Sequence, residues 1–221
     1  MQTKHSALSI TERVGQQLRE EIVTGGLLPG TQLVENDLAR KYQASRNSIR
    51  EVLNALVRDG LAVSVRYRGV FVRRFCENDL QDIYTARRTI QLHAIRTARD
   101  YTPAILEQIA RDISLAEQAI LKQDWRAVGT YSLAFHQNLV ATLNSHLINV
   151  FFLNLCAQLR LIFTIGPHES IVQTPKWVSW EKEIFSHIKN KHYQAAEKEL
   201  AAYLNESEQV LAKIVRQHQL P

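Results

Sequence analysis

The sequence predicts a mainly α-helical protein in two parts: a helix-turn-helix with a small β-hairpin, followed by an all-α antiparallel helical bundle. Three observations predict this fold class. Residues 33–72 pass from helical apolar spacing to short strand-like runs bounded by glycines. After Val72 the apolar residues show no strand pattern. The 221 residues suffice for two compact domains, which we place at 1–75 and 76–221, with the junction at Cys76-Glu77-Asn78.

Apolar residues at three- and four-residue spacing predict the first three helices. The first runs from about Ser9 to Gly25 and turns inward Val14, Leu18, Ile22 and Val23. A short second helix lies within Leu33–Tyr42. The third begins after Ser45, which stands where an N-cap belongs. Its apolar stripe consists of Ile49, Val52, Leu53, Leu56 and Val57.

A hairpin is predicted after the third helix, which Gly60 closes. Leu61–Val65 and Val70–Val72 are short β-branched and aromatic runs typical of strands. Between them lies a basic tip, Arg66-Tyr67-Arg68-Gly69. A tip of this kind is a wing that can enter a groove of double-stranded nucleic acid.

The polar side of the third helix is free to meet a partner. Arg46 and Arg50 lie on neighbouring turns near its positive end, where guanidinium groups reach phosphates and guanine edges. Asn47 reaches base edges or phosphate oxygens in the same way. Each feature also has a simpler interpretation: Ser45 only caps the helix, the two arginines are solvated surface charges, and Gly69 is an ordinary turn glycine.

Charge divides along the same boundary. Residues 1–75 hold 12 Lys and Arg against 7 Asp and Glu, whereas residues 76–221 hold 15 of each. The whole formal excess of +5 therefore lies on the first part. A basic domain neutralises phosphates and releases counterions, so its binding should weaken steeply with salt.

With these motifs in this order, the chain resembles the GntR family of bacterial transcriptional regulators. The family pattern is matched at Gly26-Leu-Leu-Pro-Gly30, Leu33-Val-Glu-Asn-Asp-Leu-Ala39, Ala44-Ser-Arg-Asn-Ser-Ile-Arg-Glu-Val-Leu53, Gly60-Leu61 and Arg68-Gly-Val-Phe-Val72. Val34 departs from the usual capping residue, and Ser48 stands where many members carry proline. The resemblance implies a winged helix-turn-helix that binds a double-stranded DNA operator. We expect its DNA contacts at Ser45, Arg46, Asn47, Ser48, Arg50, Asn36, Arg66, Arg68 and Gly69.

Beyond the junction the sequence reads as helices. They are expected near Asp79–Asp100, Pro103–Lys122, Trp125–Leu143, His146–Ile165, Pro175–Asn190 and Tyr193–Gln217. Pro103 suits the first turn of a helix, and Gly166-Pro167 and Thr174-Pro175 bracket a loop. No apolar run approaches the roughly 20 residues of a membrane span, and no signal-peptide core follows the first residues. We therefore expect a cytoplasmic protein with no membrane partner.

The second part resembles the all-helical ligand-binding (FCD) domain of the FadR subfamily within this family. Its first helix carries Arg87-Arg-Thr-Ile-Gln91 where the subfamily has glutamate at the last position. Many members of the subfamily that it resembles bind a metal ion through one Asp and three His side chains. Here those positions hold Ser132, His136, Glu181 and Tyr203, so only His136 survives. We expect no metal cofactor, because hydroxyl groups replace a carboxylate and an imidazole; the remaining arrangement is His136 with Glu181 and water.

The same positions suit a small organic effector, which we expect to be a carboxylate. The candidate effector-binding residues are Arg87, Ser132, His136, Glu181, Tyr203 and Arg160. Arg87 resembles the subfamily arginine that faces the cavity, where a guanidinium can clamp a carboxylate. Its alternative role is a surface or interhelix salt bridge. The alternative for His136 is a buried histidine satisfied by a hydrogen bond.

No sequence signature of an enzyme is present: P-loop, Gly-x-Gly-x-x-Gly, Gly-x-Ser-x-Gly and His-Glu-x-x-His are all missing from the sequence. The two cysteines, Cys76 and Cys156, are isolated and suit neither a disulfide framework nor a metal site. We expect a homodimeric DNA-binding regulator that reads a short inverted repeat. Because regulators of the family it resembles are most often repressors, we expect it to be a repressor. The alternative function is an effector-free nucleic-acid-binding adaptor whose bundle serves only dimerisation or partner contacts.

Overall fold

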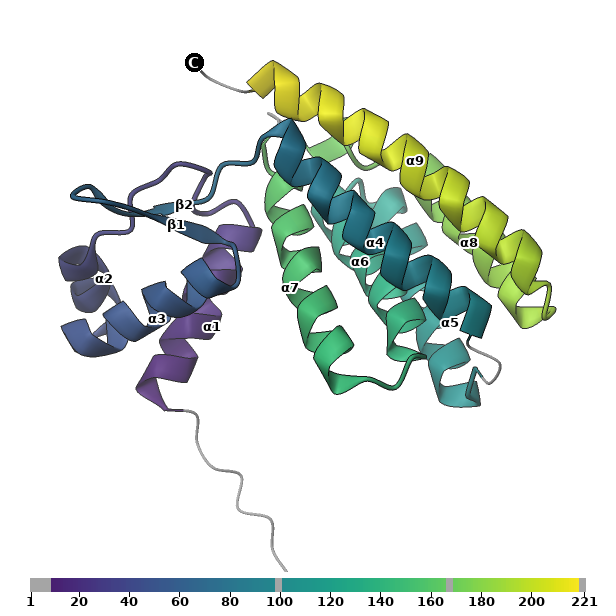
Figure 1. Ribbon diagram of the computed structural model, residues 1–221, viewed down its shortest axis with the longest axis horizontal. Coiled ribbons are helices and arrows are strands. Elements are labelled where there is room, and N and C mark those ends of the chain that lie inside the picture. The colour runs from purple at the N-terminus through teal and green to yellow at the C-terminus, as the bar shows by residue number, and fades with distance from the viewer. Residues whose placement is uncertain (1–8, 98–100, 166–168, 219–221) are drawn as a thin grey trace, which may run out of the picture. The chain divides into compact units, whose positions relative to one another are not determined.

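The structure is a computed structural model that describes residues 9–97, 101–165 and 169–218. The chain divides into two compact units, Met1–Arg74 and Phe75–Pro221. The first unit contains α1 (Ile10–Val23), α2 (Glu35–Tyr42), α3 (Arg46–Arg58), β1 (Ala62–Val65) and β2 (Gly69–Val72) (Figure 1). The second contains α4 (Glu77–Thr97), α5 (Pro103–Leu121), α6 (Trp125–Ala141), α7 (His146–Phe163), the 3-10 turn η1 (Glu169–Ile171), α8 (Pro175–Lys189) and α9 (Tyr193–His218).

The first unit is built on the packing of α1 against α3. α1 begins at a capping box, in which the Ser9 hydroxyl accepts from the Glu12 amide and the Glu12 carboxylate accepts from the Ser9 amide. The core side chains of the two helices are Val14, Leu18, Ile22, Ile49, Val52, Leu53 and Leu56. Burying this apolar surface is the main stabilising contribution to the unit. Val23, which was expected to face inward, is only half-buried at the helix end.

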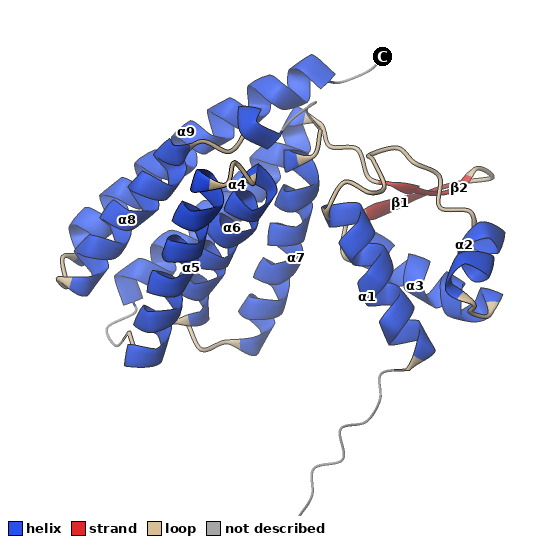
Figure 2. Cartoon of the chain, turned by 180° about the vertical axis from the view of Figure 1, so that it is seen from behind, coloured by secondary structure: helices blue, strands red, loops and turns tan. Residues whose placement is uncertain are grey.

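The hairpin β1–β2 is antiparallel, with Val65 opposite Gly69 at the closed end (Figure 2). The Arg68 amide donates to the Val65 carbonyl at 2.9 Å, and the Gln32 side-chain amide donates to the Arg68 carbonyl at 2.9 Å. Tyr67 and Gly69 have φ of +62° and +100°. Glycine adopts such angles freely, whereas tyrosine does so under strain. The tip is thus a fixed turn with one strained aromatic residue.

The second unit is a helical bundle of α4 to α9 (Figures 1 and 2). α4 lies beside α9, α5 beside α6, α6 beside α7, and α8 beside α9. Pro103 opens α5 and Thr102 caps it, as the sequence predicts. The largest fully buried side chains of this unit include Tyr84, Phe135, Phe152, Leu80, Ile95, Ile109 and Leu139. Polar groups inside this core therefore need partners from neighbouring helices.

The predicted fold class is confirmed, and the predicted helices and strands appear within a turn of their expected ends. Several helices end earlier than predicted. For example, α6 was expected to reach Leu143 but ends at Ala141, because Thr142 forms its C-cap. The turn η1 was not predicted. The expected helix end at Asp100 and the Gly166-Pro167 part of the predicted loop lie outside the described residues.

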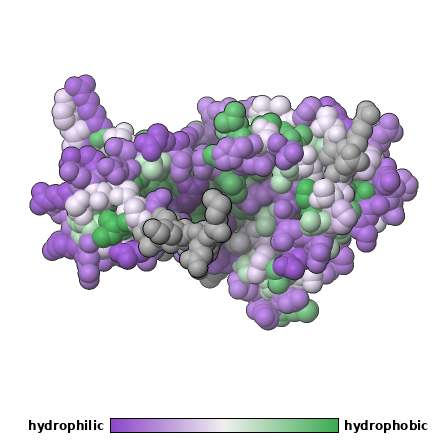
Figure 3. Space-filling view, turned by 90° about the horizontal axis from the view of Figure 1, so that it is seen from below, coloured by the Kyte–Doolittle hydropathy of each residue, from purple (hydrophilic) through white to green (hydrophobic). Residues whose placement is uncertain are grey.

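α7 corrects the expectation that no apolar segment approaches membrane length. Its 18 residues have a mean hydropathy of 1.5, which by length and composition suffices for a membrane span. Within the bundle 44% of that window is buried, including Phe152, Leu155, Leu159 and Ile162. Four of its apolar side chains stay exposed: Leu147, Val150, Phe151 and Leu153. On the face shown in Figure 3, hydrophilic side chains predominate and hydrophobic ones form small groups.

Candidate nucleic-acid interface and candidate ligand site

The first turn of α3 presents the polar side chains that the sequence singled out. Ser45 caps the helix as predicted: its hydroxyl oxygen accepts from the Ser48 amide at 3.1 Å. Arg46 and Asn47 are exposed in the first turn, and Ser48 is half-buried against Ser45. Asn36, in the first turn of α2, is also exposed. These side chains are therefore accessible to a partner.

Arg50 is exposed but not unpaired, which the sequence did not reveal. Its Nε donates to Glu35 Oε1 at 3.2 Å and its Nη2 to Glu35 Oε2 at 3.0 Å. The Arg50 hydrogen bond lowers the pKa of Glu35, so this carboxylate is ionised at neutral pH. This bidentate interaction fixes the Arg50 guanidinium relative to α2. The remaining N–H groups of Arg50 are left to donate to a phosphate or a base edge.

The hairpin tip carries Arg66, Arg68 and Gly69 on the surface, as predicted. It also carries Tyr67, which is 91% exposed and was not among the expected contacts. The Arg66 guanidinium lies 4.8 Å from the centre of the Tyr67 ring, within cation–π range. The sequence shows that an aromatic residue lies in the basic tip. The positive φ of Tyr67 could not be predicted, because it depends on the register of the hairpin.

The second unit brings together the four side chains that the sequence aligned by helical register. Ser132 on α6 and Tyr203 on α9 both donate to Glu181 Oε1 on α8, Tyr203 at 3.1 Å. His136 Nε2 lies 3.8 Å from the same oxygen. All four side chains are buried. We call Ser132, His136, Glu181 and Tyr203, with Arg87 and Gln91 of α4, the polar cluster.

Hydrogen bonding within the polar cluster is incomplete. His136 Nδ1 lies 2.6 Å from Gln91 Oε1, which only accepts, so Nδ1 carries the proton and Nε2 is left as an acceptor. Burial first, and the charge of Arg87 second, hold the pKa of His136 well below its usual value, so the ring is neutral. Four buried atoms of the cluster have no hydrogen-bond partner among the described residues: Arg87 Nε, Gln91 Nε2, His136 Nε2 and Glu181 Oε2.

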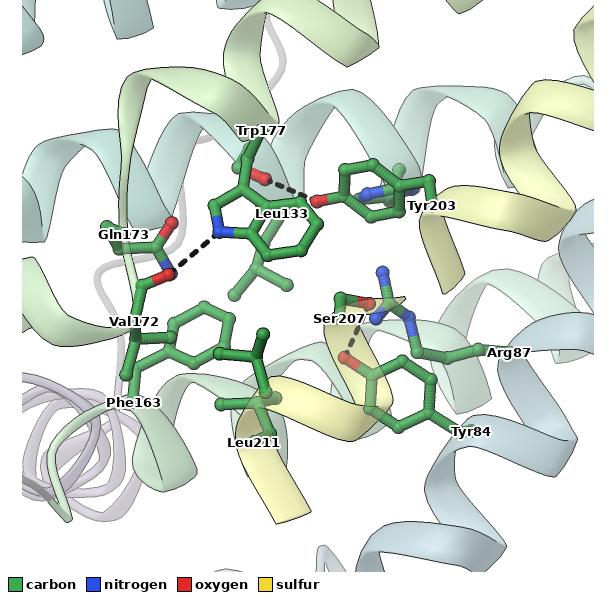
Figure 4. A pocket seen from close by; sticks show the side chains of 13 residues that line it. Tyr84, Arg87, Leu133, Phe163, Val172, Gln173, Trp177, Tyr203, Ser207 and Leu211 are labelled. Carbon is green, nitrogen blue, oxygen red and sulfur yellow. Dashed lines mark hydrogen bonds between the residues drawn. The ribbon is translucent and has the colours of Figure 1, made fainter. Parts of the chain in front are cut away.

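Arg87 is the charged member of the cluster and is only 3% exposed. No carboxylate of the described residues forms an ion pair with it, which rules out a salt bridge to those residues as its role. Its guanidinium lies 4.8 Å from the Tyr84 ring and points toward Ser207 and Tyr203 (Figure 4). A buried guanidinium without a carboxylate is costly to keep.

Beside Arg87 is a cavity of about 20 Å³, room for a water molecule or two. Its polar wall includes Arg87, Ser132, His136 and Tyr203, and its apolar wall is formed by Leu133, Phe163, Val172, Trp177, Val210 and Leu211. Arg160 and Glu181 were also expected to line it and do not. Arg160 instead forms a bidentate ion pair with Glu169: its Nη1 donates to Oε2 and its Nη2 to Oε1, each at 2.9 Å.

The donor set does not fit the metal site that the resemblance implies. No group of three or more His, Cys, Asp or Glu side chains converges anywhere in the described part of the chain. Hydroxyl groups occupy two of the four positions, and both donate to Glu181 rather than facing an open point. His136 Nε2 and Glu181 remain too few for a tetrahedral site.

Comparison with known proteins gives matches to both units. Residues 10–72 match the model for bacterial regulatory proteins of the gntR family, and residues 82–206 match the FCD domain. The galactonate operon transcriptional repressor of Escherichia coli K12 is 24% identical over 94% of this chain and 99% of its own length. The gluconate operon transcriptional repressor of Bacillus licheniformis is 26% identical over 68% of this chain. The match covers 62% of that relative's own length, which is less than two thirds. The crystal structure of a GntR regulator from Rhodococcus sp. RHA1 superposes with a TM-score of 0.85 at 28% identity, covering 96% of this chain and all of that one.

Glu181 should make stability depend on pH. Burial, which outweighs the hydrogen bonds from Ser132 and Tyr203, raises its pKa from 4.5 to about 7. An acid whose pKa is raised on folding contributes stability below its unfolded value, and that stability is lost as pH rises through the folded value. Glu181→Gln mimics the protonated acid at every pH. The unfolding free energy of this variant, relative to that of the wild type, should therefore rise by about 2 kcal/mol between pH 5 and pH 8. Urea unfolding of both proteins at the two pH values measures this, and a pH-independent difference would contradict it.

Proposed function

The chain belongs to the GntR family of bacterial regulatory proteins and carries an FCD domain, and on that premise we propose that it is a transcriptional repressor controlled by a small organic anion. Members of this family are transcriptional regulators and not enzymes. As a homodimer it binds a short inverted repeat, because a two-fold assembly reads a two-fold site. The first unit contacts DNA, the second binds the effector, and the protein acts in the cytoplasm.

The proposal for the first unit is supported by its exposed polar groups. Arg46, Asn47 and Arg50 stand at the start of α3, where the helix dipole is positive. Arg66 and Arg68 stand at the hairpin tip. In this arrangement α3 lies in the major groove and reads bases, while the tip follows the backbone or the adjacent minor groove. The basic excess of residues 1–75 supplies the salt-dependent part of the affinity.

The proposal for the second unit rests on one observation: the buried guanidinium of Arg87 has no carboxylate partner among the described residues, and its Nε has no hydrogen-bond partner there. An anionic ligand removes the cost of that burial by pairing with it. The named relatives control gluconate and galactonate operons, and both compounds are organic anions. An anion-responsive second unit is therefore consistent with the family and with the charge in its core.

The small cavity supports a switch. Ligand pockets usually enclose about 300–1,000 Å³, far more than the about 20 Å³ beside Arg87. An effector must therefore part the walls, and the bound form differs from the form described. A ligand that prefers one of two conformations shifts the population toward it, and this is how binding in the second unit changes operator affinity.

The DNA proposal is tested by Arg50→Ala. Operator fragments are first selected from random DNA with the wild-type protein, and affinity is then measured at one fixed salt concentration. The variant should lose about 1–3 kcal/mol of binding free energy without unfolding, because a guanidinium contact to a base or phosphate is lost. Arg58→Ala, in the last turn of α3, makes the same charge change away from the N-terminus and serves as the control. Equal, small losses in both variants would remove Arg50 from the interface.

Tyr67 provides a second test because its strain separates stability from binding. Glycine tolerates a φ of +62°, so Tyr67→Gly should leave the unfolding free energy unchanged or raise it by about 1 kcal/mol. The same change should weaken operator binding several-fold, since the exposed ring no longer packs against the DNA sugars. Thermal unfolding and the operator titration are run on the same preparation. A variant that binds DNA as well as the wild type would show that Tyr67 does not touch it.

A further inference from the structure

Glu35 places a negative charge among the arginines of the proposed DNA-binding surface, where phosphates would repel it. The hydrogen bond from Arg50 lowers the pKa of this carboxyl, and the charge of Arg46 acts on it in the same direction, so Glu35 stays ionised. The side chains of Arg50 and Glu35 are 58% and 37% exposed, and ion pairs as exposed as this one contribute little to stability. Folding therefore gives no sufficient reason for an acid at this position.

The ion pair leaves one edge of the Arg50 guanidinium available. Nε donates to Glu35 Oε1 at 3.2 Å and Nη2 to Glu35 Oε2 at 3.0 Å, so the donors along one side of the planar group are used. The N–H groups at the far end of the side chain, on Nη1 and Nη2, remain as two parallel donors. Among the base edges of the major groove, guanine alone presents two adjacent acceptors, O6 and N7. The free edge of Arg50 therefore matches guanine.

The charge of the pair favours a base over a phosphate. Contacts to phosphates depend on net positive charge, whereas contacts to bases depend on the direction of the hydrogen bonds. Arg50 and Glu35 together carry no net charge, and the Glu35 carboxylate repels phosphate oxygens. Arg46, which precedes Arg50 on α3, is exposed and forms no ion pair with the described residues, so it keeps its full charge for a phosphate.

We propose that Glu35 is a specificity-determining residue, which holds Arg50 in the orientation that reads a guanine and prevents it from binding a phosphate. This inference rests on the proposed function and narrows the Arg50 contact from a base or a phosphate to one base. Glu35 is a positioning residue in this arrangement, because it touches Arg50 and not the DNA. Without Glu35 the flexible arginine turns to the nearest phosphate, so binding becomes stronger and less selective.

The base preference of the operator tests the proposal directly. Fragments are selected from random DNA with the wild-type full-length protein, each base pair is then replaced in turn, and affinities are measured at one salt concentration. Arg50→Ala identifies the base pair that Arg50 reads, because its replacement no longer matters in that variant. In Glu35→Gln the preference for guanine at the same base pair should fall about tenfold, as expected for the loss of one bidentate base contact.

Asp37→Asn is the matched control. Asp37 lies with Glu35 in the first turn of α2, and it pairs with Arg40 on the same helix. The substitution therefore removes the same charge from the same helix end without touching Arg50, and the guanine preference should be kept. Both acids are partly or fully exposed, so neither variant should unfold, and the Tm of each preparation checks this.

The salt dependence of binding gives a readout that a merely structural role of Glu35 would not change. In Glu35→Gln, Arg50 is free to bind a phosphate, so the slope of log affinity against log salt should steepen by about 0.9, the contribution of one phosphate contact. Affinity for a scrambled fragment of the same length should rise as well. Glu35→Gln added to Arg50→Ala should change neither the base preference nor the slope, because both effects act through Arg50.

Several results would overturn the inference while the wild type still binds its selected operator, so the proposed function would stand. These are an unchanged guanine preference in Glu35→Gln, a loss of preference at a base pair other than that of Arg50, and an equal loss in Asp37→Asn. An Arg50→Ala variant that changes the preference at no base pair would likewise place Arg50 on a phosphate. If the wild-type protein selects no DNA from the random pool, the proposed function itself is wrong.

Discussion

A positive charge without a carboxylate partner constrains the second unit. Arg87 is 3% exposed, and in the described residues no carboxylate pairs with it. Burying an unpaired ion costs several kcal/mol, so the surrounding core must supply that stability from apolar packing. Burial first, and this charge second, hold the pKa of His136 well below its usual value, whereas burial raises the pKa of Glu181 to about 7 against the opposing effect of Arg87. A core of this kind gives up some stability to keep a charged group inside it.

The polar cluster also shows how one set of positions can change its chemistry while the fold is kept. Four positions on three helices meet at one point, where the resemblance implies metal ligands. In this chain Ser132 and Tyr203 fill the point with hydroxyl groups that hydrogen-bond to Glu181. The carboxylate that would bind a cation is occupied by these donors, so this set of side chains no longer suits a metal ion.

Much of the fold and part of the site were predictable because they depend on local spacing. Helical periodicity located the helices, and helical register was enough to bring Ser132, Glu181 and Tyr203 together with His136. The partners of individual side chains were not predictable. The pairing of Arg50 with Glu35 depends on how two helices cross, and that of Arg160 depends on where the segment after α7 places Glu169. The cavity volume was equally out of reach, because it depends on packing to within a fraction of an ångström.

The aromatic wall of the cavity gives the protein a built-in optical reporter. Trp177 lines the cavity, its indole N–H donates to the Val172 carbonyl at 2.8 Å, and its ring stacks on Trp180 with centroids 6.3 Å apart. The chain has three tryptophans, and the third, Trp125, lies at the start of α6 and does not line the cavity. One of the three indoles therefore lines the cavity, and a second stacks directly on it. Their ultraviolet emission follows the polarity and rigidity of that wall, so occupancy of the cavity can be read from unlabelled protein.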